Sequence, residues 1–182
     1  MTDLAAPFID ARDRLADLTD GLSSDDFNRK PSAKSWSAGE CIVHLNKTAK
    51  VYLPRFESAL GPDAPRGTGP FTYGWIGRRF VEGVRPGSMA IPTLPGMKPP
   101  TADAHASAID PERALERFHL DIARYLAVVQ AADGVDLAAV KIRSPFLPLL
   151  KLPVGAFIEA MGLHSVRHVM QAERAVAAVG AA

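Results

Sequence analysis

The C-terminal stretch of the chain decides the fold. Residues 153–180 read PVGAFIEAMGLHSVRHVMQAERAVAAVG, and their large side chains recur every three or four residues. That spacing is typical of an α-helix with one buried face. The positions on this face are Phe157, Met161, His164, His168, Gln171, Ala175 and Val179. The stretch therefore predicts a helix that begins at Pro153 and continues nearly to the C-terminus.

Two earlier segments predict helices of the same kind. Residues 4–22 place leucines at three- and four-residue steps, with Asp and Arg between them. Ser37 and Glu40 have the spacing of a capping box, in which each side chain accepts a hydrogen bond from the other residue's backbone N–H. The helix that follows Ser37 is expected to run to about Leu60, with a kink at Pro54.

A fourth helix is predicted to follow Asp110, because Asp is a good N-cap and Pro111 suits the first helical position. This helix is expected to end at Gly134. Its inner face is predicted to consist of Leu115, Phe118, His119, Ile122, Leu126 and Val129.

The segment between the helix that ends near Leu60 and the helix that follows Asp110 differs in composition from the helices. Residues 61–100 contain eight prolines and eight glycines, a density that excludes one long helix or strand. A short helix is expected over about residues 73–82, where Trp75 either walls a pocket or pins the connector to the body. Four long helices and one long Pro/Gly-rich crossover predict an all-α four-helix bundle, with residues 1–182 in a single domain.

Composition and charge narrow the classes of function. Of the 182 residues, 47% are hydrophobic and 23% are charged, as in an ordinary globular protein. Lys and Arg number 21 against 20 Asp and Glu, so the chain lacks the basic surplus of a nucleic-acid-binding protein. The single cysteine, Cys41, excludes an intramolecular disulfide and a cysteine-based zinc site.

The sequence also predicts that the protein lies in the cytoplasm, away from membranes. Acidic residues appear from Asp3 onward and no long apolar stretch follows, so no signal peptide is expected. The most apolar late stretch, residues 146–163, is interrupted by Pro148, Lys151 and Glu159 and is too short to span a bilayer.

Three histidines lie on faces that are predicted to point inward. His164 and His168 are four residues apart, so their rings lie one above the other on the last helix. His44 lies on the buried side of the second helix, and a third imidazole from there would complete a three-nitrogen metal site with an open position. The alternative is that these are hydrogen-bonded core histidines without a metal.

Four further residues are candidates for the surroundings of such a site, each with a simpler interpretation. Glu40 either orients His44 or is only the capping-box acid. His119 is a candidate fourth ligand or proton carrier, or a structural histidine. Gln171 lies on the ligand face and is placed to contact a bound water, and Trp75 is a candidate pocket wall.

Two motifs resemble those of a known family. Residues 29–45, RKPSAKSWSAGECIVHL, resemble the "RPS…WS-x-x-E-x-x-x-HL" stretch of the DinB-like superfamily, and residues 162–171, GLHSVRHVMQ, resemble its "H-x-x-RH-x-x-Q" helix. The proline-rich residues 84–101 and the KIRSPF stretch at 141–146 are similar to one branch of that family.

The resemblance implies a four-helix bundle with a divalent metal ion, most often zinc or nickel, on His44, His164 and His168. Characterised relatives include transferases that use low-molecular-weight thiols, a maleylpyruvate isomerase and metal-dependent hydrolases, and dimers are common. The expectation is therefore a metal-dependent enzyme that activates a thiol or a water to attack a small-molecule substrate. The dimers among the relatives make a homodimer one candidate assembly. The alternative is a non-catalytic stress protein that binds a metal or a small ligand.

Overall fold

The computed structural model describes residues 3–89, 93–147 and 149–180. The helices and strands within these ranges are α1 (Ala6–Thr19), α2 (Ser24–Asn28), α3 (Ala38–Ala59), α4 (Gly74–Val84), the 3-10 turn η1 (Pro95–Met97), α5 (Pro111–Ala131), β1 (Lys141–Arg143), β2 (Lys151–Pro153) and α6 (Val154–Gly180). The prediction of an all-α fold is confirmed. No helix among the described residues is both long and apolar enough to cross a membrane.

The helices begin where the capping residues predict. Ser37 Oγ accepts from the backbone N–H of Glu40 at 3.1 Å, and Glu40 Oε2 accepts from the N–H of Ser37 at 2.9 Å. Asp110 Oδ1 accepts from the N–H of Arg113 at 3.2 Å at the start of α5. Because these bonds satisfy N–H groups that have no partner inside the helix, they fix the first turns of α3 and α5.

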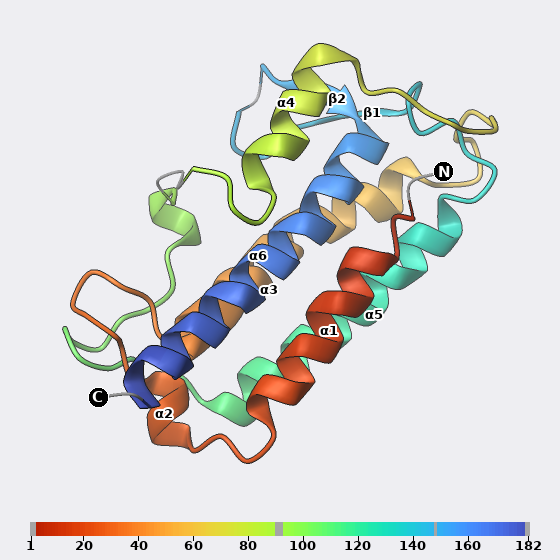
Figure 1. The fold of residues 1–182 in the computed structure, drawn as a ribbon. Helices are drawn as coiled ribbons and strands as arrows, with labels where there is room; N and C mark the ends of the chain where they lie inside the picture. The colour runs from red at the N-terminus through yellow and green to blue at the C-terminus, as the bar shows by residue number, and fades with distance from the viewer. Residues whose placement is uncertain (1–2, 90–92, 148, 181–182) are drawn as a thin grey trace.

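The four long helices form the bundle. In Figure 1, α1 and α5 lie on one side, and α3 and α6 lie side by side on the other. Helix α6 also packs against α1, where a Cβ on Gly162 would lie only 3.0 Å from the Cβ of Pro7. The absence of a side chain at position 162 therefore allows α1 to approach α6 closely.

Aromatic rings fill the space between the helices. Phe8 of α1 stacks on Tyr125 of α5 with ring centroids 4.6 Å apart, and Phe56 of α3 packs on the same tyrosine. Tyr52 of α3 meets Phe157 of α6 at 5.7 Å. These contacts join all four long helices into one apolar core.

The segment between α3 and α5 packs onto the body. Helix α4 lies over the first half of α6, with Phe80 edge-on to Phe157 at 5.0 Å. Strands β1 and β2 pair antiparallel, with Ile142 opposite Leu152, at the end of the bundle where α6 begins (Figure 1). This arrangement brings α4 and the residues before α6 together over one end of the α3–α6 pair.

The buried face of α5 differs from the predicted one. Its buried residues are Ala114, Phe118, Asp121, Ile122, Tyr125 and Val128, whereas His119 is exposed. The prediction that His119 lies on the inner face is therefore wrong. Tyr125 faces inward because its ring packs on Phe8 and Phe56, and Asp121 can be buried on the same face because its carboxylate pairs with the guanidinium of Arg117.

Candidate metal centre

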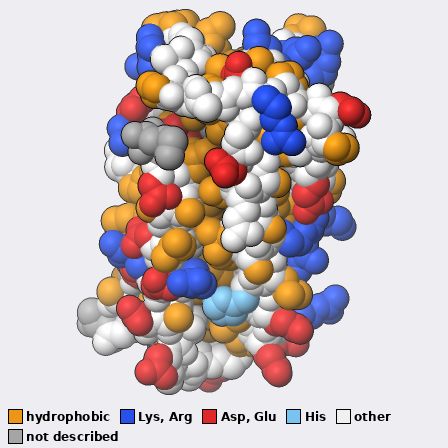
Figure 2. All heavy atoms as spheres, turned by 90° about the vertical axis from the view of Figure 1, so that its right-hand side faces the viewer, with side chains coloured by type: hydrophobic (Ala, Val, Ile, Leu, Met, Phe, Trp, Pro, Cys, Tyr) orange, Lys and Arg blue, Asp and Glu red, His pale blue; other side chains and the backbone are white. Residues whose placement is uncertain are grey.

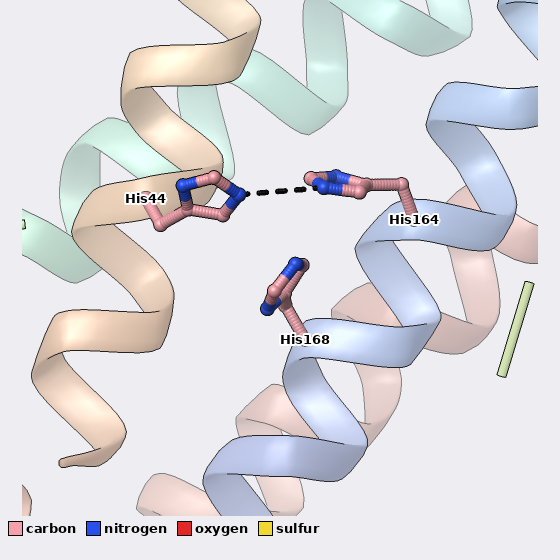
Figure 3. Close-up of side chains that lie close together, drawn as sticks. All are labelled: His44, His164 and His168. Atoms are coloured by element: carbon pink, nitrogen blue, oxygen red, sulfur yellow. Dashed lines mark hydrogen bonds between the residues drawn. The ribbon is translucent and has the colours of Figure 1, made fainter. Parts of the chain in front are cut away.

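Three imidazoles from two helices converge at one point. His44 projects from α3, and His164 and His168 project from successive turns of α6, as Figure 3 shows. One ring nitrogen from each histidine lies within 4.8 Å of the other two. The Nε2 atoms of His44 and His164 are 3.3 Å apart. Among the described residues, this is the cluster that has the composition and spacing to hold a metal ion.

Backbone and side-chain acceptors set the orientation of two of the rings. The Nδ1 of His44 lies 2.9 Å from the carbonyl oxygen of Met97. Because a carbonyl only accepts, this Nδ1 carries the hydrogen and donates it, which leaves the lone pair on Nε2. His168 Nδ1 likewise donates to Gln171 Oε1 at 3.0 Å. Both rings therefore turn a lone-pair Nε2 toward the cluster, as metal-bound histidines do.

Burial keeps the three rings neutral. Only 6% of His44 and 9% of His168 are exposed. Burial is the main cause that lowers the pKa of His44, lowers that of His164 to about 3 and lowers that of His168 well below its ordinary value. Each ring also disfavours a positive charge on its neighbours. At neutral pH each ring is therefore neutral and keeps one nitrogen without a hydrogen, which is the form that binds metal ions.

The geometry fits a divalent ion. In a tetrahedral site with zinc–nitrogen bonds of about 2.0–2.1 Å, two ligand nitrogens are separated by about 3.3–3.4 Å. The separation between His44 Nε2 and His164 Nε2 is 3.3 Å. A lone pair on His44 Nε2 at this distance needs either a proton on His164 or a cation between the two nitrogens. The donor set, the ring orientation and the spacing thus all suit a bound metal ion.

The histidines open onto a cavity of about 1090 Å³. Its walls come from α3, α4 and α6, from residues 31–36, 93–98 and 144–147, and from Leu150. Two described parts of the segment between α3 and α5 therefore line the cavity beside the histidines, since α4 contributes Arg79, Phe80, Gly83 and Val84 and the η1 region contributes Met97. A cavity of this size next to the three nitrogens leaves room for a ligand beside any bound ion.

The other residues singled out in the sequence separate into two groups. Gln171 lies in the site and orients His168. Glu40 is fully buried but serves α3, because its carboxylate accepts hydrogen bonds from Ser37 and Thr101 and forms an ion pair with Lys30 at 3.8 Å. No contact between Glu40 and His44 is found among the described residues. Trp75 is 70% exposed and does not line the cavity, and exposed His119 lies on α5.

Sequence reasoning missed two residues that touch the histidines. Trp36 stacks on His168 with ring centroids 5.8 Å apart, and its ring centroid lies 5.1 Å from that of His44. Met97 contributes its carbonyl to His44 from 53 positions along the chain, and no side-chain pattern signals such a contact. Cys41, one turn before His44, is fully buried, and burial raises the pKa of its thiol, so it is a core residue.

Fold and site together define a class of protein: a helical bundle in which three histidines from two neighbouring helices meet at an open cavity. Residues 8–172 match the DinB superfamily, and the chain belongs to that family. Comparisons with curated proteins and with solved structures give no match. The family match covers both motifs that carry His44, His164 and His168.

Proposed function

We propose that the protein is a metal-dependent enzyme that holds one divalent ion, zinc or nickel, on His44, His164 and His168. Its substrate is a small molecule, and its reaction is the transfer of a low-molecular-weight thiol or a hydrolysis. The observation that carries the proposal is the convergence of three neutral imidazoles at a cavity of about 1090 Å³. A purely structural metal site has a closed set of protein ligands and no such opening.

The chain's own residues prepare the site. Met97 and Gln171 hold the imidazoles of His44 and His168 with the lone pairs turned inward. The ring of Trp36 covers one side of His168 and excludes water there. A divalent ion bound by these rings lowers the pKa of a thiol or of water and so supplies a nucleophile at neutral pH.

The size of the cavity favours thiol transfer over hydrolysis. Sites for a single drug-sized ligand span about 300–1,000 Å³, and this cavity of about 1090 Å³ lies just above that range. A hydrolase needs room for one substrate and a water, whereas a transferase holds a thiol and an electrophile together. The apolar wall near Tyr52, Phe80 and Phe146 offers a surface for the carbon skeleton of an electrophile.

Elemental analysis of the purified protein tests the site directly. Wild type is compared with His164→Ala and with the matched control His119→Ala, which removes an exposed histidine from α5. We expect about one zinc or nickel ion per chain in wild type and in His119→Ala, and almost none in His164→Ala. Absence of metal in wild type, or equal metal in His164→Ala, would contradict the proposal.

A second measurement separates an enzyme from a non-catalytic binding protein. The ion is replaced by cobalt(II), whose visible spectrum reports its ligands, and small thiols are added. A new thiolate-to-cobalt band supports an open position for a nucleophile, and turnover is then sought with alkylating and acyl electrophiles. A spectrum that no thiol changes argues against thiol transfer, and the absence of ester and amide hydrolysis as well would favour the metal-binding protein without catalysis.

A further inference from the structure

The charged residues that line the cavity are all of one sign. Five basic side chains and no acidic one lie among its described lining residues: Lys34, Arg79, Lys98, Arg167 and Arg174. The whole chain, by contrast, has 21 basic and 20 acidic residues. The described lining of the cavity is therefore positively charged, although the whole chain is nearly neutral.

These positive charges are not neutralised by carboxylates. No ion pair joins any of the five to an acidic residue within the part of the chain that the structure describes. Arg167 instead donates to the carbonyl oxygens of Gly83 and Met89, at 3.3 and 3.2 Å, and these acceptors carry no net charge. Arg167 is half-buried, whereas the other four cations are exposed, so salt screens part of their attraction for an anion.

The cavity has a basic end and an apolar end, on opposite sides of the histidines. On α6, Arg174 lies six residues beyond His168, whereas Met161 lies three residues before His164. Met161 and Arg174 are therefore separated by about 20 Å along the helix. The apolar end consists of Tyr52, Phe80, Phe146, Leu147, Leu150 and Met161, with Arg79 as a single cation next to Phe80 on α4.

Two further cations belong to the basic end through their neighbours. Lys98 follows Met97, whose carbonyl binds His44. Lys34 precedes by two positions Trp36, whose ring stacks on His168. Lys34, Lys98 and Arg174 thus come from three separate segments that line the same cavity as the histidines.

We infer that this cavity binds a small molecule with an anionic group, a carboxylate or a phosphate, at Lys34, Lys98 and Arg174 and an apolar group at the opposite end. The inference rests on the proposed function for one point only, namely that the reacting sulfur or oxygen lies between the two ends, at the histidines. An anionic thiol at the basic end and an apolar electrophile at the other would meet there.

The charge preference is tested with a probe that does not need a metal ion. S-Hexylglutathione carries two carboxylates and a hexyl chain on sulfur, and its diethyl ester has the same skeleton without the carboxylate charges. Each is titrated calorimetrically into the full-length purified protein. We expect the acid to bind at least about tenfold more tightly than the diester, with the difference shrinking as salt is added.

Charge-reversal variants locate the anionic end. In Arg174→Glu and Lys98→Glu the affinity for the acid is expected to fall by about tenfold or more, while the affinity for the diester does not fall. Arg113→Glu makes the same change of charge at an exposed position of α5 outside the cavity and should alter neither affinity.

Three results would overturn the inference: equal binding of acid and diester by wild type, binding of neither, or equal loss of both in Arg174→Glu. Failure of the metal proposal gives a different pattern. The protein would then lack metal in elemental analysis and still prefer the acid over the diester, because the probe has no free thiol and the basic end does not depend on the ion.

Discussion

The two sides of the bundle are built from similar amphipathic helices and differ in what their polar residues do. On the side formed by α1 and α5, hydrophobic side chains lie between acidic and basic side chains, as Figure 2 shows. On the side formed by α3 and α6, three imidazoles and several cations face a cavity that contains no described acidic residue. Ion pairs join charges within the first side, whereas none of the cations that line the cavity pairs with an acidic residue in the part of the chain that the structure describes.

This difference separates packing from function. On the α1–α5 side, Arg14 pairs with Asp10 and also reaches Glu173 of α6, and Arg117 pairs with buried Asp121. On the α3–α6 side, the polar groups of His44 and His168 are held by neutral acceptors, so their Nε2 atoms stay available to a ligand. The buried Asp121 is paired, whereas the buried Nε2 atoms of His44 and His168 are left available to a ligand. This difference is why we place the proposed functional site at the histidines.

The largest expected effect is on the α1–α5 side. Phe8 is fully buried and stacks on Tyr125, so Phe8→Ala should lower the free energy of unfolding by about 3–5 kcal/mol. Urea unfolding followed by circular dichroism measures this change. The neighbouring Ile9 is 38% exposed, and Ile9→Ala should cost much less. Equal costs for the two variants would show that the stacked pair does not stabilise this side.

The next effect concerns metal affinity on the α3–α6 side. Gln171 accepts the hydrogen of His168 Nδ1, so Gln171→Ala should weaken metal binding by about 10–100-fold while leaving the fold intact. Competition with a chromophoric chelator measures the affinity. Gln130 is exposed on α5, and Gln130→Ala is the matched control. An unchanged affinity in Gln171→Ala would mean that this hydrogen bond does not orient a ligand.

How much the sequence could predict follows the same division. The bundle helices were predictable because Ser37 and Asp110 are strong caps and because the apolar positions repeat locally. His164 and His168 were found together because a spacing of four places two side chains on one face of any helix. His44 joined them because it lies on the buried side of α3 and in a motif that resembles the family's.

The remainder depended on contacts that local spacing does not encode. Met97 reaches His44 through its backbone, which carries no sequence signal. His119 was assigned to the inner face of α5 because it continues a stripe of apolar residues. The buried face instead contains Asp121, whose burial is possible because Arg117 pairs with its carboxylate. Trp75 illustrates the same limit, since an aromatic residue on a short helix has no partner implied by its sequence.

A smaller effect is expected from pH in protein stripped of metal with a chelator. Burial lowers the pKa of His164 from 6.5 to about 3 in the folded chain. Below pH 6.5 the unfolded chain therefore binds a proton that the folded chain does not, and stability falls as the pH falls toward 3. Between pH 7 and pH 5 this histidine should account for about 1–2 kcal/mol of lost stability.

The variant His164→Gln isolates that contribution. Its free energy of unfolding should fall less than that of wild type between pH 7 and pH 5, whereas His119→Gln, at an exposed position, should follow wild type. Denaturant titrations at the two pH values give both differences. Parallel losses in wild type and His164→Gln would contradict the assignment of a neutral, buried imidazole at position 164.

The smallest change in the free energy of unfolding is predicted for removal of an ion pair at the protein surface. Arg14 lies 3.0 Å from both Asp10 and Glu173, and its side chain is 40% exposed. Exposed pairs of this kind contribute about 0–1 kcal/mol, because solvent and salt screen the attraction and two long side chains must be ordered. Arg14→Ala should therefore change the free energy of unfolding by less than about 1 kcal/mol, and 0.5 M salt should remove the difference.

Removing Arg174, an exposed cation that lines the cavity, should likewise leave the free energy of unfolding almost unchanged but weaken binding of the anionic probe. If Arg14→Ala weakened that binding equally, the distinction between neutralised and available charge would fail.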